Sequence, residues 1–177
     1  HRVIEIAAVE MINRRPTNQH FHQYLKPDCD IDAAAQEVHG ITLEFLQDKP
    51  LFVAIAQEMI SFIGDAELII HNAPFDLGFL NSELGKIGMQ PVTHYCGNII
   101  DTLKMAKNSR PGQRNNLDAL CRHFGIDNSK RTLHGALLDA ELLAEVYMAM
   151  TRGQESLMMD LGQATTRREV TASSQIQ

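Results

Sequence analysis

HNAPFD, residues 71–76, follows Glu67–Ile70, a short apolar run that is typical of a buried strand. After it, leucines recur at helical spacing between residues 77 and 84. Pro74 suits the first turn of such a helix, where a missing N–H group costs little. The pattern therefore predicts that Asp76 lies where a core strand ends and a helix begins. A carboxylate at this position can be structural, because it complements the helix dipole, or it can be chemical.

A second acidic stretch, HGALLD at residues 134–139, opens the longest helical pattern, residues 136–150. On one regular helix, five residues turn two side chains about 140° apart. His134 and Asp139 therefore converge only if His134 lies in the loop before the helix. Asp76 and Asp139 would then form a pair of carboxylates from separate helices, with an imidazole beside them.

Such a site suits divalent cations and acid–base chemistry. Carboxylates are ligands for Mg²⁺ or Mn²⁺, and a histidine has the near-neutral pKa that proton abstraction from water requires. Two such ions can activate a water and stabilise the leaving oxygen of a phosphodiester. The alternative is three unrelated roles: a capping Asp76, a surface His134 and a helix-borne Asp139.

The remaining pattern predicts an α/β class with a mixed sheet. A hairpin comes first, with strands over residues 1–12 and 20–25, and a further strand lies near residues 98–100. Helices are expected after Asp32, after Thr42, from Phe52 to Ile63, after Asp101, near residues 117–124 and over residues 136–150. Residues 88–97 are expected to be a loop. We predict one domain over residues 1–152 and a flexible polar linker or tail over residues 153–177.

Composition excludes a membrane-spanning protein and a strongly basic one. No apolar run approaches the roughly 18–20 residues of a membrane helix, and no signal-peptide pattern opens the chain. An odd set of irregularly spaced cysteines (Cys29, Cys96 and Cys121) suggests reduced thiols and a cytoplasmic location. The net charge of −6 argues against broad electrostatic binding of nucleic acid. Residues 104–131 nevertheless hold seven basic and two acidic side chains, which suits either a local anionic contact or a solvated helix face.

Five short motifs occur in order along residues 2–152. They are Val38-His39-Gly40-Ile41-Thr42, His71-Asn72-Ala73-x-Phe75-Asp76, Asp101-Thr102-Leu103, Leu117-Asp118-x-Leu120-Cys121 and His134-x-Ala136-Leu137-x-Asp139-Ala140. In this order they resemble the DnaQ-like 3′–5′ exonucleases that use a catalytic histidine, and among these the proofreading subunits of bacterial replicative polymerases.

The resemblance implies a ribonuclease-H-like fold, two divalent cations (Mg or Mn) and release of nucleoside 5′-monophosphates from a DNA 3′ end. It implies that Asp76 and Asp139 are metal carboxylates and that His134 is the general base. It places His39, Asn72 and Asp139 at the bound substrate. Phe75 could pack on the freed base, although a core position is the favoured alternative.

One motif of the family has no counterpart here. The family's first motif is an Asp-x-Glu pair on a strand ahead of the hairpin, and neither Glu5 nor Glu10 has the matching spacing. We therefore expect that an N-terminal piece, with the first strand and the main metal-bridging carboxylate, belongs to the complete protein. Without it, the sheet should lose many buried contacts.

The implied partners are a single-stranded or frayed DNA 3′ end, the catalytic subunit and the other core subunits of the polymerase. Residues 154–159 also resemble the short peptide by which replication proteins bind a sliding clamp, with Gln154, Leu157 and Met159 as anchors. Such short peptides arise often by chance, and a frayed helix end is the favoured alternative. Two other functions stay open. One is a related nuclease that trims RNA or free DNA ends, and the other is a non-catalytic binding module that has lost the first metal motif.

Overall fold

The first two strands form the antiparallel hairpin that the sequence predicts. Val3–Ile12 (β1) pairs with Arg15–Tyr24 (β2), and the chain turns between them. This computed structural model describes residues 1–133, 135–153 and 166–176. The other elements are α1 (Ala33–His39), α2 (Leu43–Leu46), α3 (Phe52–Ile63), β3 (Glu67–Ile70), α4 (Ala73–Lys86), η1 (Val92–His94), β4 (Asn98–Asp101), α5 (Thr102–Ser109), α6 (Leu117–Phe124), α7 (Ala136–Met150) and β5 (Arg168–Ile176).

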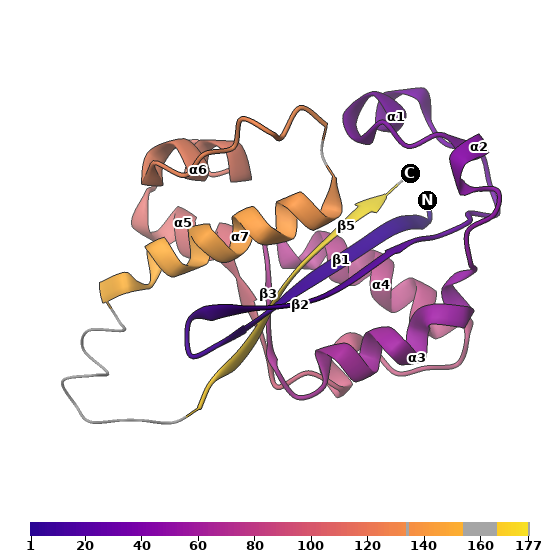
Figure 1. The fold of residues 1–177 in the computed structure, drawn as a ribbon, viewed down its shortest axis with the longest axis horizontal. Coiled ribbons are helices and arrows are strands. Elements are labelled where there is room, and N and C mark those ends of the chain that lie inside the picture. Colours follow the sequence, from indigo (N-terminus) through magenta and orange to yellow (C-terminus); the bar gives the residue numbers. More distant parts are fainter. Residues whose placement is uncertain (134, 154–165, 177) are drawn as a thin grey trace.

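In the described part of the chain, the strands form one five-stranded mixed sheet in the order β2-β1-β5-β3-β4 (Figure 1). β1 runs antiparallel to β2 and β5, whereas β3 runs parallel to β5 and β4. The three parallel strands therefore end at the same edge of the sheet. Helices pack on both faces, which confirms the predicted α/β class with a mixed sheet.

Each face of the sheet has its own apolar core. Leu68 and Ile70 of β3 pack with α3 and α4, while Ile69 between them packs on the other face with α5, α6 and α7. The predicted helix over residues 52–63 is observed and buries one apolar face: Phe52, Ile55, Ala56, Met59, Ile60 and Ile63. β3 is thus apolar on both sides, as a strand covered by helices on both faces must be.

Local signals in the sequence set most helix starts. The side chains of Asp32, Thr42 and Asp101 accept backbone N–H groups in the first turns of α1, α2 and α5, as predicted. The expected loop at residues 88–97 contains the short 3₁₀ helix η1, a small correction. None of the described helices combines the length and the apolar content that crossing a membrane would need.

The prediction of a flexible tail is wrong for residues 168–176. These residues form β5, which lies between β1 and β3 and pairs with both. It fills the place beside β1 where the sequence left the sheet without a strand. The rest of the predicted tail, residues 154–165 and 177, lies outside the described residues.

Two polar side chains of β5, those of Arg168 and Thr171, bind neighbouring elements and hold the strand in this central place. The Arg168 guanidinium donates to the carbonyls of Phe62 and Ile63 at the end of α3 and pairs with Glu10. Thr171 donates its hydroxyl hydrogen to the Ala140 carbonyl of α7 at 2.9 Å. The polar composition that predicted a linker is therefore compatible with a central strand, since these groups are paired rather than buried alone.

Candidate functional site

A cleft of about 270 Å³ opens at the edge where β3 and β5 end. His71, directly after β3, lies on one side, and residues 172–175 of β5 lie on another. The first turns of α4 and α7 contribute Asp76 and Asp139. The carboxyl edge of parallel strands is where α/β proteins usually bind ligands. The structure thus brings together the two carboxylates, sixty-three positions apart, that the sequence singled out.

The Asp76 side chain is bound by a residue of β5. Its Oδ1 accepts the hydroxyl hydrogen of Ser174 at 2.5 Å. Burial raises the pKa of Asp76 to about 6, because the charged form loses water, and the hydrogen bond from Ser174 opposes this shift.

Asp139 is paired with a residue that the sequence did not single out. The Arg131 guanidinium donates from Nε to Oδ1 at 2.6 Å and from Nη2 to Oδ2 at 3.1 Å. Both side chains are almost fully buried, with exposed fractions of 8% for Arg131 and 9% for Asp139. Two parallel bonds between a guanidinium and a carboxylate form a strong and geometrically specific pair.

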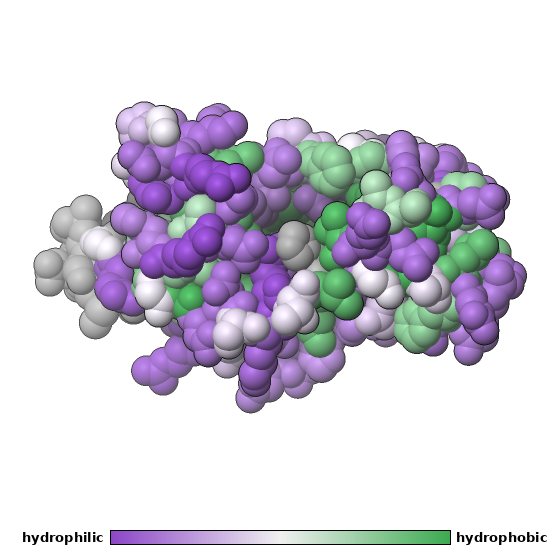
Figure 2. All heavy atoms as spheres, turned by 90° about the horizontal axis from the view of Figure 1, so that it is seen from above, coloured by the Kyte–Doolittle hydropathy of each residue, from purple (hydrophilic) through white to green (hydrophobic). Residues whose placement is uncertain are grey.

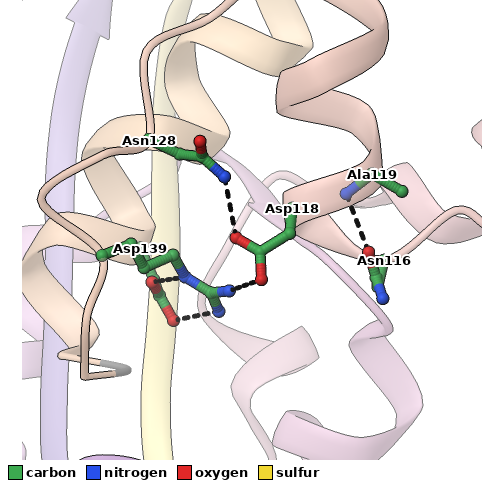
Figure 3. Close-up of polar contacts among 6 residues, drawn as sticks. Asn116, Asp118, Ala119, Asn128 and Asp139 are labelled. Carbon is green, nitrogen blue, oxygen red and sulfur yellow. Dashed lines mark hydrogen bonds and ion pairs between the residues drawn. The ribbon is translucent and has the colours of Figure 1, made fainter.

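Arg131 also reaches a second acid, Asp118 of α6. Its Nη1 lies 2.7 Å from Asp118 Oδ2, and Asp118 Oδ1 accepts from Asn128 at 3.0 Å. Figure 3 shows Asp118 and Asp139 on either side of this guanidinium, close to the start of α6, where Asn116 caps the helix through the Ala119 N–H group. One buried cation is therefore shared between two carboxylates.

Arg131 was one of the seven basic residues of the 104–131 segment, for which the sequence offered a solvated face or an anionic contact. Neither describes it, because its guanidinium faces two carboxylates of the same chain. The available signal was position: Arg131 stands three residues before His134, inside the loop that leads to Asp139. The pairing of Arg131 was not predicted because the seven basic residues were considered together.

His71 is a further cleft residue that the sequence analysis assigned no role. Its Nδ1 lies 2.9 Å from Thr102 Oγ1, while its Nε2 is buried without a hydrogen-bond partner among the described residues. Burial lowers the pKa of His71, so the neutral imidazole is favoured. Phe75 also lines the cleft and is 53% exposed, so the favoured expectation of a core position for Phe75 is wrong.

His39 and Asn72 are two of the predicted substrate-binding residues. His39 ends α1, is buried, and accepts the Ile41 N–H group on Nδ1 at 3.0 Å. Asn72 is exposed, has a φ angle of 63°, and donates its backbone N–H to Asp101. Neither lines the cleft in the part of the chain that the structure describes. His134, the predicted general base, lies outside the described residues.

As arranged, the described residues do not fit a divalent cation. Both Asp139 oxygens are taken by Arg131, and one Asp76 oxygen is taken by Ser174. β5 contributes Ala172, Ser173, Ser174 and Gln175 to the cleft, none of which is an acid. Glu5 pairs with His22, and Glu10 pairs with Arg168, so neither acid takes the place of the family's first motif. Within residues 1–133, 135–153 and 166–176, no group of three or more metal-ligating side chains is present.

Part of the molecular surface on the side of α1 and α2 is apolar. Figure 2 shows hydrophobic residues gathered over that side, whereas the part over α6 is largely hydrophilic. The exposed apolar side chains there include Val38 and Phe45 (48% and 46% exposed). Leu133, 51% exposed, lies against Gly40, so the loop before α7 touches the end of α1.

We predict that Gly40→Ala destabilises the fold by about 1–2 kcal/mol. Gly40 has a φ angle of 68°, and a Cβ there would lie 2.6 Å from Leu133 Cδ1. The measurement is the free energy of unfolding in denaturant. Gly78→Ala is the matched control: Gly78 lies within α4 with open space around it, so that variant should gain about 0.5–1 kcal/mol. Equal effects of the two changes would contradict the strained left-handed cap.

Residues 1–147 match the RNase T family, whose description is "Exonuclease". The chain is 58% identical over 157 residues to the DNA polymerase III subunit epsilon of Pasteurella multocida. The aligned region covers 89% of this chain and 62% of that protein. It is 50% identical over 185 residues to the Escherichia coli protein of the same name, and that alignment covers 99% of this chain and 76% of the Escherichia coli protein. The chain thus spans less than two thirds of the Pasteurella protein.

Solved structures share the fold. Exonuclease X in complex with 5′ overhanging duplex DNA superposes with a TM-score of 0.65 at 25% identity, over 85% of this chain and 82% of that one. The nuclease domain of 3′hExo, a DEDDh family member bound to rAMP, superposes with a TM-score of 0.74 at 19% identity, over 86% and 82% of the two chains. These likenesses confirm the predicted ribonuclease-H-like fold.

Proposed function

Because the chain belongs to the RNase T family of DnaQ-like exonucleases, we propose that it is the nuclease part of a proofreading 3′–5′ DNA exonuclease. One structural observation supports the proposal in addition to membership of the family. Asp76 and Asp139 begin separate helices and line one cleft at the carboxyl edge of the parallel strands. The reaction is hydrolysis of the terminal phosphodiester, with release of nucleoside 5′-monophosphates.

In this proposal the protein's own groups have distinct tasks. His134 takes a proton from the attacking water, since an imidazole has a suitable pKa near neutral pH. Phe75, exposed at the cleft, packs on the base of the terminal nucleotide, because base–aromatic stacking tolerates any sequence. The segment with His39, and Asn72, borders the terminal nucleotide. Asp76 and Asp139 would be two of the acids that hold divalent cations, Mg or Mn, and such cations would supply charge that activates water and stabilises the leaving oxygen.

The described acids are too few for that cation site, so the proposal adds no step through it. For a cation to reach Asp139, Arg131 would have to leave it. We further propose partners: a frayed DNA 3′ end, the catalytic subunit and the other core subunits of DNA polymerase III, and a sliding clamp. The clamp anchors Gln154, Leu157 and Met159 lie outside the described residues. These partners would place the protein in the cytoplasm.

A digestion experiment tests the function. We expect the full-length protein, with Mg²⁺ or Mn²⁺, to shorten DNA from the 3′ end and to digest a mispaired end faster than a matched one. A mispaired nucleotide unstacks more cheaply and so reaches the cleft more often. RNA of the same sequence is the matched control. Preferential digestion of RNA would favour the related end-trimming nuclease, and complete inactivity with retained binding of DNA would favour the binding module.

A further inference from the structure

We propose that residues 173–176 of β5 form a strap that closes the cleft and peels away from β1 when the end of a nucleic-acid strand enters. The strap contributes Ser173, Ser174 and Gln175 to the wall of the cleft. This inference rests on the proposed function for the identity of the ligand. The opening of the strap is a property of the fold and can be measured without a ligand.

β5 has two parts, which pair with their neighbours differently. Residues 168–172 pair with β1, and residues 169–172 also pair with β3 on the other side. Residues 173–176 pair with β1 alone, because β3 ends at Ile70, opposite Ala172. The register of the pairing with β1 also shifts between Val3 and Glu5, which lie opposite the far end of the strap. The strap is therefore held by one ladder of backbone hydrogen bonds, whereas the first part of β5 lies between two.

The burial of side chains changes at the same point in the strand. Glu169, Val170 and Thr171 are at most 1% exposed, whereas the strap residues are only partly buried. Arg168 and Thr171 also bind α3 and α7 through hydrogen bonds. In the strap, Ile176 packs at the edge of the core, with its side chain partly buried. Segments with few buried contacts open at the lowest free-energy cost, so the strap should open while the first part of β5 stays in the sheet.

The Ser174 side chain joins the strap to the opposite wall of the cleft. Its hydroxyl donates to Oδ1 of Asp76, in the first turn of α4, at 2.5 Å. Within the described part of the chain, this is the one hydrogen bond that a strap side chain makes. A hydrogen bond to a carboxylate is stronger than one between neutral groups. Its loss should therefore shift the equilibrium toward the open form.

The closed cleft is small for the proposed ligand. Its volume of about 270 Å³ lies below the roughly 300–1,000 Å³ of sites that enclose a drug-sized ligand. Because three strap residues form part of the wall, peeling widens the cleft on the side of Asp76. Phe75, exposed at the cleft, can then receive the base of a terminal nucleotide. The closed form thus excludes a strand that the open form admits.

Hydrogen exchange of the full-length protein tests the opening without a ligand. We expect the strap amides that pair with β1 to exchange at least about tenfold faster than those of residues 169–171. Ser174→Ala should accelerate the strap by about a further tenfold and leave residues 169–171 unchanged. Ser82→Ala is the matched control, because Ser82 is an exposed serine of α4, the helix that carries Asp76. Equal protection of the two parts of β5, or equal acceleration of both, would overturn the strap.

Binding of a labelled single-stranded DNA oligonucleotide tests the link between opening and the ligand. Fluorescence anisotropy with a chelator present measures affinity without cleavage. If only the open form binds, the apparent affinity scales with the fraction of open protein. Ser174→Ala should therefore bind about tenfold more tightly, the same factor as in hydrogen exchange, and Ser82→Ala should bind like the wild type. Weaker or unchanged binding by Ser174→Ala would overturn the inference.

A conservative variant and the digestion experiment separate the remaining outcomes. Ser174→Thr keeps the hydroxyl and should return both measurements toward those of the wild type. Values like those of Ser174→Ala would overturn the role of the hydrogen bond. Fast exchange of the strap in a protein that does not digest DNA would leave the closure correct and the proposed function wrong. Uniform protection of β5 in an active nuclease would overturn the strap alone.

Discussion

His134→Ala is expected to lower the turnover of DNA 3′ ends by about 10²-fold or more, the usual scale for removing a general base. In the proposed reaction the imidazole abstracts the proton, so its removal leaves the attacking water without a base. Single-turnover digestion of a labelled oligonucleotide by the two proteins measures the loss.

His123→Ala is the matched control for this change. His123 is an exposed imidazole in the last turn of α6, so its removal should leave the rate unchanged. Calorimetric binding of a DNA oligonucleotide to the His134 variant should stay close to that of the wild type, because the base acts on water rather than on the bound strand. Near-normal turnover in His134→Ala would remove His134 from the mechanism.

The part of the site that the sequence predicted depends on local signals. Asp76 follows an apolar strand and a proline, and Asp139 follows a glycine at the head of the longest helix, so both were assigned to helix starts without any knowledge of packing. α4 follows β3, so Asp76 belongs to the edge where the parallel strands end. α7 follows α6 and a loop, so the meeting of Asp139 with Asp76 was predicted from the order of the family's motifs and not from strand geometry.

The features that the sequence did not predict depend on contacts between residues that are far apart in the chain. Arg131 belongs to a basic segment, and only the fold places Asp118 and Asp139 on either side of it. Phe75 was expected in the core, yet its ring lies at the mouth of the cleft, beside Phe79. β5 has a polar sequence with a buried acid, Glu169, which is unusual for a central strand. Periodicity carries no information about such partners.

Val170→Asp is expected to destabilise the protein by more than about 4 kcal/mol, enough to unfold a domain of ordinary stability. Val170 is fully buried in β5 and packs in the core shared with α3, α4 and β3. A carboxylate there would lose its water without gaining a partner. Chemical denaturation followed by circular dichroism measures the loss. Should this variant not fold at all, Val170→Ala, with a loss of about 2 kcal/mol, keeps the effect measurable.

Val53→Asp makes the same chemical change at a position that is 59% exposed on α3, and we expect it to cost less than about 1 kcal/mol. The difference between the two variants therefore reports the burial of β5 and not the charge itself. Equal and small effects would mean that a different segment fills the place between β1 and β3. Ser174 would then no longer hold Asp76, and a strand that carries acids could bring them to the same cleft. The stability of Val170→Asp therefore tests whether residues of β5 lie beside Asp76 in the cleft.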